Sequence, residues 1–125
     1  MKQVSGRLRW WFKVHFLVDY LFAIPLFFAP VWALGLLGVD VSDPLFVRLF
    51  AAALFGIGGV SMLVQKESLE VYRAMLKLKI IWSSAAIAAF VWAMFTNPPS
   101  LGLFLGFGAF TVFFFIWRYF YTITS

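Results

Sequence analysis

The stretch PLFVRLFAAALFGIGGVSMLV, residues 44–64, decides the fold, because it contains a single charged side chain, Arg48. An α-helix crosses a bilayer with about 20 mainly apolar residues, since each residue adds 1.5 Å. Asp43 precedes the stretch and suits a helix N-cap, and Pro44 suits the first helical position, where its missing N–H costs nothing. The segment therefore predicts a membrane-spanning helix.

Similar apolar segments lie on both sides of this one. They predict three more spanning helices, over 14–37, 69–95 and 101–121. Residues 1–13 form a basic and aromatic segment that suits the membrane interface. Short connections make consecutive helices antiparallel neighbours. We therefore expect an all-α integral membrane four-helix bundle that forms a single transmembrane domain over residues 1–125.

The composition supports lipid as the main solvent. Of the 125 residues, 64% are hydrophobic and 12% are charged, whereas a soluble domain carries about 25% charged residues. The net charge of +5 would also suit nucleic acid, but the basic residues flank apolar segments and so match anionic lipid headgroups. We expect no nucleic-acid partner. The absence of cysteine excludes disulfides and thiolate metal sites.

The basic residues also predict the orientation of the chain. In the four-helix layout, nine of the ten Lys and Arg fall on one side, and only Arg48 falls on the other. The positive-inside rule makes the basic side cytoplasmic. We expect a multi-pass protein of the cytoplasmic membrane with both termini inside the cell. The nine residues are Lys2, Arg7, Arg9, Lys13, Lys66, Arg73, Lys77, Lys79 and Arg118.

Two ionisable residues, His15 and Asp19, interrupt the first apolar segment. Such groups are costly inside a membrane, so each is a functional hypothesis by default. Their spacing of four places them on one helix face. Because histidine exchanges a proton near neutral pH, the pair could relay protons. The alternative is structural: a cation fixes Asp19, with Arg118 as the first candidate and Lys77 or Lys79 as others.

Two prolines and one arginine mark further candidate positions. Pro25 and Pro30 each remove a helical hydrogen bond, which predicts a kinked first helix. Together with Asp19, the kink indicates a cavity for a lipophilic ligand such as a lipid or quinone. Arg48 is expected to bond Asp40 or Asp43, or to reach headgroups. The alternative for Arg48 is recognition of an anionic or polar ligand at the outer mouth.

Small residues in the three later segments predict where helices approach closely. Lipid is as apolar as leucine, so helices associate in membranes where small side chains permit close packing. The same pattern would also suit a homo-oligomer or a contact with a partner subunit. The predicted packing residues are Ala52, Gly56 and Gly59 in 44–64, Ala85 and Ala89 in 69–95, and Gly102 and Gly106 in 101–121.

Catalytic motifs are missing from the sequence. A single His cannot supply two axial haem ligands, and no Ser/His/Asp order, P-loop or His-Glu-x-x-His motif occurs. We expect neither an enzyme nor a resident metal or cofactor.

The layout resembles the small four-helix DoxX-like proteins and related uncharacterised prokaryotic membrane proteins. The resemblance lies in the proline-containing first helix, in RLFAAALFGIG (residues 48–58) and in RAMLKLKIIW (residues 73–82). It implies a four-helix bundle and, for some members, an accessory role beside membrane redox enzymes; it carries over no site residue. Three functions remain: an accessory or structural subunit of a larger membrane complex, a lipid- or quinone-binding protein, and an oligomeric channel or transporter that uses His15 and Asp19.

Overall fold

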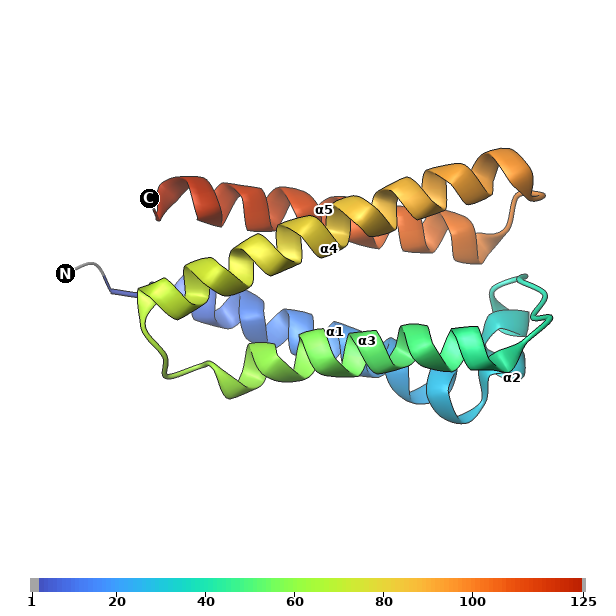
Figure 1. Ribbon diagram of the computed structural model, residues 1–125, viewed down its shortest axis with the longest axis horizontal. Coiled ribbons are helices and arrows are strands. Elements are labelled where there is room, and N and C mark those ends of the chain that lie inside the picture. The colour runs from blue at the N-terminus through green and yellow to red at the C-terminus, as the bar shows by residue number, and fades with distance from the viewer. Residues whose placement is uncertain (1–2, 125) are drawn as a thin grey trace. The chain divides into compact units, whose positions relative to one another are not determined.

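The computed structural model describes residues 3–124, and this part of the chain is helical (Figure 1). Lys2, one of the nine basic residues of the orientation argument, lies outside the described residues. Four of the helices are long and apolar enough to cross a membrane, as a multi-pass membrane protein requires. The helices are α1 (Gly6–Phe28), α2 (Pro30–Leu36), α3 (Pro44–Leu63), α4 (Leu69–Thr96) and α5 (Leu101–Ile123).

The start of the first helix differs from the prediction. α1 begins at Gly6 and not at residue 14, so the segment expected at the interface is mostly helical itself. The N-cap is Ser5, whose hydroxyl accepts a hydrogen bond from the Leu8 N–H at 3.1 Å. This cap satisfies one of the free N–H groups of the first turn. The basic and aromatic side chains that follow are compatible with a helix, which explains why it starts early.

The end of the first helix also differs, because the predicted segment 14–37 is two helices. α1 ends at Phe28, Ala29 has non-helical angles (φ −141°, ψ 63°), and Pro30 opens α2. Pro30 cannot donate to the helix that precedes it, but it fits the first position of a new one. Pro25, by contrast, lies inside α1. Gly38 follows α2 with a φ of 73°, a value that suits glycine because it has no side chain.

The other three helices match their predicted bounds closely. The predicted cap of α3 is confirmed, since an Asp43 carboxylate oxygen accepts from the Leu45 N–H at 2.9 Å. Ser68 caps α4 in the same way, with a longer bond of 3.4 Å from the Val71 N–H. Ser100 follows Pro98 and Pro99 and caps α5 through the Leu103 N–H at 3.2 Å. Each cap belongs to the residue class that accepts from free N–H groups.

The chain forms two compact units, Met1–Tyr72 and Arg73–Ser125. In the first, α1 and α3 pack along each other, and α2 contacts both (Figure 1). Buried residues recur every three or four positions on both helices, as one face of a helix requires. They are Leu8, Phe12, His15, Asp19, Ala23 and Leu26 on α1, and Ala51, Leu54, Gly58 and Ser61 on α3.

The junction between the units lies in the first turns of α4. Tyr72 belongs to the first unit, where its hydroxyl donates to the Gln65 carbonyl at 3.2 Å and its ring centroid lies 4.5 Å from that of Phe12. Arg73 belongs to the second unit. Its guanidinium donates to the Tyr121 carbonyl at 3.0 Å and to the Thr124 hydroxyl at 2.9 Å. A cation in this position satisfies free carbonyls at the C-terminus of α5 and matches the helix dipole.

Aromatic rings join α4 and α5 within the second unit. The Phe110 ring of α5 lies between two rings of α4, with its centroid 5.7 Å from that of Trp82 and 5.8 Å from that of Phe90. These are ordinary separations for packed aromatic pairs. The ring contacts therefore hold the two helices together.

Candidate functional site

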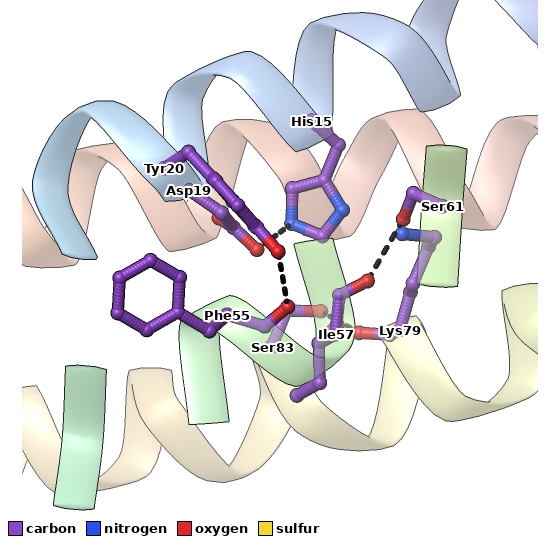
Figure 2. A network of polar contacts seen from close by, with 8 residues as sticks. All are labelled: His15, Asp19, Tyr20, Phe55, Ile57, Ser61, Lys79 and Ser83. Atoms are coloured by element: carbon purple, nitrogen blue, oxygen red, sulfur yellow. Dashed lines mark hydrogen bonds and ion pairs between the residues drawn. The ribbon is translucent and has the colours of Figure 1, made fainter. Parts of the chain in front are cut away.

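The structure pairs the two ionisable residues of α1. His15 and Asp19 are 3% and 6% exposed, and the His15 Nε2 lies 3.2 Å from the Asp19 Oδ2 (Figure 2). The spacing of four predicted this juxtaposition, since such residues lie one turn apart on a helix. Asp19 is 13 residues beyond the first residue of α1, about 20 Å along the helix at 1.5 Å per residue. The pair thus lies in the middle of α1.

The contact between the two side chains is close, but the Asp19 Oδ2 has no hydrogen-bond donor among the described residues. At 3.2 Å the two groups can interact as an ion pair. However, the Asp19 Oδ2 accepts no hydrogen bond from any donor in residues 3–124. A buried carboxylate oxygen normally accepts at least one hydrogen bond. The two groups are therefore in contact, and the carboxyl has unused hydrogen-bonding capacity.

Helix α3 covers the pair with a glycine. A β-carbon on Gly58 would lie 2.6 Å from the Asp19 β-carbon, closer than two packed carbon atoms allow. Gly58 is buried beside Ser61, whose hydroxyl donates to the Ile57 carbonyl at 2.9 Å (Figure 2). The absence of a side chain at residue 58 thus lets α3 approach the acid.

The remaining polar group at this level of α1 bonds the α3 backbone. The Tyr20 hydroxyl donates to the Phe55 carbonyl at 3.1 Å (Figure 2). Gly59 was predicted as a packing residue, and a β-carbon there would lie 2.7 Å from the same hydroxyl. At this level of α1, the packing against α3 therefore combines a hydrogen bond between the helices with two close approaches at glycines.

Other predicted packing residues in α3 and α4 lie elsewhere. Ala52 and Gly56 are exposed on α3, and nothing lies within 4 Å of a β-carbon built on Gly56. Ala85 and Ala89 are exposed on α4. Small residues occur on several sides of α3, so the sequence pattern alone did not identify the side that faces α1. The side of α3 that packs against α1 is the one with Gly58, against Asp19, and Gly59, against Tyr20.

The predicted glycine pair in α5 is half-buried. A β-carbon on Gly106 would overlap the ring of Phe90 in α4, so close packing between α4 and α5 depends on glycine at this position. Gly102, one turn earlier, is also partly covered. Within the second unit, the predicted motif thus includes a residue that packs against the neighbouring helix.

Arg48 makes a contact that the sequence did not predict. Its Nε donates to the Phe27 carbonyl at 2.9 Å. The expected partner Asp43 instead caps α3, and Asp40 is exposed. The break at Ala29 deprives the last carbonyls of α1 of helical partners. Arg48 therefore satisfies the interrupted helix end.

Pro25 and Arg118 complete the predicted candidates. Pro25 is half-buried, and its carbonyl accepts from the Ala29 N–H at 2.9 Å, the last helical bond before the break. Arg118 is exposed on α5, in the second unit, and its carbonyl accepts from the Thr122 hydroxyl at 2.9 Å. The predicted pairing of Arg118 with Asp19 stays a prediction.

Lys79 was assigned to the basic side of the membrane and was one of the cations considered as a partner of Asp19. It is 1% exposed on α4. Its ammonium nitrogen lies 4.9 Å from the centre of the Trp117 ring, within reach of a cation–π interaction. The Ser83 hydroxyl donates to the Lys79 carbonyl at 2.6 Å (Figure 2). A helix with apolar residues on all sides gives no sequence signal for which face is buried.

The described residues contain no group of side chains that forms a recognisable metal centre. Among residues 3–124, no three His, Cys, Asp or Glu side chains lie close enough to hold a metal ion. Comparison of the sequence and structure with protein-family models, with curated proteins and with solved structures gives no significant match. The His15–Asp19 pair, covered by Gly58, is therefore the candidate site that the geometry supports.

Proposed function

We propose that this chain is a small, non-catalytic integral membrane protein that acts as an accessory subunit of a larger membrane complex. The observation that carries the proposal is the surface of α5. Phe104, Val112 and Phe115 are 58%, 59% and 65% exposed, and only Trp117 and Phe120 of this helix are buried. Aromatic side chains supply large contact areas to protein partners. Lipid chains contact the same surface when no partner is bound.

Site-specific photocrosslinking in the native membrane separates partner from lipid. A photoreactive phenylalanine analogue would replace Phe104 or Phe115, and the 2% exposed Phe120 serves as the matched control. We expect one adduct of defined mass, with the same second protein, from both exposed positions and none from residue 120. Lipid adducts alone at both exposed positions would refute the proposal. Adducts with a second copy of this chain would show that the protein forms a homo-oligomer through this surface and would refute the accessory role.

The proposal includes the topology and the family relationship expected from the sequence. Both termini lie on the cytoplasmic side of the cell membrane, the break after Phe28 bends the first span, and the four long helices form one bundle. The distribution of basic residues and the Ala29 angles support these statements. The resemblance of the sequence layout to DoxX-like proteins supports the accessory role, since some of those proteins work beside membrane redox enzymes.

A second candidate function is an oligomeric channel or transporter for protons. The buried His15–Asp19 pair favours it, because intramembrane ionisable groups mark ion pathways. Purified protein in liposomes with an internal pH dye would reveal proton flux under a membrane potential. Asp19→Asn should abolish the flux, and Asp43→Asn, at an exposed helix cap, should retain it. Equal flux in wild type, Asp19→Asn and protein-free vesicles would eliminate this candidate.

The third candidate, a lipid- or quinone-binding protein, remains a prediction. A ligand cavity was inferred from the prolines of the first segment, and the break at Ala29 lies at this place, next to Arg48. Native mass spectrometry of protein extracted in mild detergent would detect a retained lipid or quinone at a fixed stoichiometry.

A further inference from the structure

The Asp19 carboxyl has hydrogen-bonding capacity that its described surroundings leave unused. The side chain is 8% exposed, His15 Nε2 lies 3.2 Å from Oδ2, and this oxygen accepts no hydrogen bond within residues 3–124. An ionised oxygen in this state is costly, whereas a protonated carboxyl supplies a donor of its own. We propose that Asp19 is a proton-binding site, in which the bound proton lies between the Asp19 oxygen and the His15 ring.

The proton balance of the pair follows from its two groups. A proton from water forms an O–H bond on Asp19, and the O–H then donates to a neutral His15 Nε2. Movement of the proton to the nitrogen gives carboxylate and imidazolium, with no change in the net charge of the pair. Loss of the proton leaves a buried negative charge, which is costly in an apolar environment. The two groups therefore exchange protons as a coupled pair.

The helices of the first unit place no other titratable group against the carboxyl. α3 covers it with Gly58, and Arg48, the only ionisable residue of α3, bonds the Phe27 carbonyl. α2 has no ionisable residue. On α1, Lys13 is exposed, and the Tyr20 hydroxyl donates to a backbone carbonyl. His15 is thus the proton partner that this unit provides.

A buried protonated carboxyl has a distinctive reactivity toward lipophilic carbodiimides. The carboxyl oxygen adds to the central carbon of the reagent, and its proton moves to a reagent nitrogen. The acyl group then shifts to nitrogen, so the product retains every atom of both reactants. A lipophilic carbodiimide enters bilayers, whereas a charged, water-soluble one reaches carboxyls in water. The two reagents therefore distinguish Asp19 from the exposed Asp43.

The experiment uses the full chain in liposomes and locates each adduct by peptide mass spectrometry. With dicyclohexylcarbodiimide, we expect modification of Asp19 that falls at least tenfold as the pH of the liposome suspension is raised. Asp43 should react with the water-soluble reagent. The measurement needs no variant, so a folding defect cannot obscure it. Absence of Asp19 modification at every pH, or modification that is independent of pH, would overturn the proposal.

His15→Gln tests the role of the histidine. The glutamine can still hydrogen-bond Asp19 but cannot accept its proton, so the pH midpoint of Asp19 modification should move. An unchanged midpoint would overturn the assignment of His15 as the proton partner. The inference concerns proton binding and not transport, and it is independent of the accessory role. Modification of Asp19 without proton flux would support proton binding and refute transport. Failure to find a protein partner would refute the accessory role and leave the modification of Asp19 unaffected.

Discussion

Gly58 of α3 lies against Asp19 of α1, so closely that a β-carbon on the glycine would lie 2.6 Å from the Asp19 β-carbon and 3.0 Å from Oδ2. Asp19, the buried acid of α1, is thus covered by a glycine, which has no side chain and so allows α3 to approach most closely. A larger residue would force α3 away and open the carboxyl to its surroundings. This relationship links helix packing to the chemistry of the pair.

Gly58→Ala should destabilise the first unit by about 1–3 kcal/mol, since overpacking forces neighbouring backbone or side chains to shift. Gly56→Ala is the matched control, because nothing lies within 4 Å of a β-carbon there. Alanine also favours helix over glycine by roughly 1 kcal/mol, so the control should be neutral or stabilised. Unfolding in detergent, followed by circular dichroism, measures both. Equal stability of the two variants would contradict the described α1–α3 contact.

Gly106→Ala should weaken packing between α4 and α5, because the new β-carbon would overlap the Phe90 ring. In the double variant with Phe90→Ala, removal of the obstructing ring should recover part of the loss. Comparison of the two single variants with the double variant would reveal this recovery as coupling. Gly108→Ala has open space and serves as the control. Thermal unfolding of the four variants in one detergent gives the comparison. Strictly additive effects of the two substitutions would show that the residues do not touch.

Arg48→Gln should loosen the junction between α1 and α2. The variant loses the charged hydrogen bond to the Phe27 carbonyl, and bonds to charged groups contribute roughly 1.5–3 kcal/mol. We expect faster hydrogen–deuterium exchange in residues 27–34 and little change elsewhere. Lys66→Gln, at an exposed loop position, provides the control. Exchange that is unchanged in this segment would mean that Arg48 does not hold the helix end.

Single cysteines can test the proposed orientation without interference, because the natural chain has none. Suitable exposed positions are Gln3, Glu67 and Thr122 on the predicted inner side, and Asp40 and Asn97 on the predicted outer side. A membrane-impermeant thiol reagent added to intact cells should label only the cysteines at 40 and 97. Labelling of only the other three cysteines from outside would show that the orientation is the reverse of the proposed one. A mixed pattern would show that one of the four long helices does not cross the membrane.

The helices were largely predictable because apolar length and cap residues are local signals. Asp43 and Pro44 indicated the start of α3, and the predicted Asp43 cap is present. The break at Ala29 was predicted only as a kink within one helix. The early start at Gly6 was missed, because a polar helical turn and an irregular interfacial segment share the same composition.

The site was less predictable than the helices. The spacing of four brought His15 and Asp19 together as expected, since it depends only on helix geometry. The covering residue was not foreseen: the predicted stripe contained Ala52 and Gly56, whereas Gly58 faces the acid. Helices with apolar residues on every side carry no amphipathic pattern, so only tertiary packing decides which face is inside.

The most direct test of the account is a solid-state NMR measurement in lipid bilayers. His15 is the only histidine, so ¹⁵N-labelled histidine with ¹³C-carboxyl aspartate reports the pair without assignment ambiguity. We predict a dipolar coupling between the ring Nε2 and one of the aspartate carboxyls, lost in Asp19→Asn, and no magnetisation transfer from bulk water to the ring. A ring in contact with bulk water and without a carboxyl coupling would contradict the buried pair.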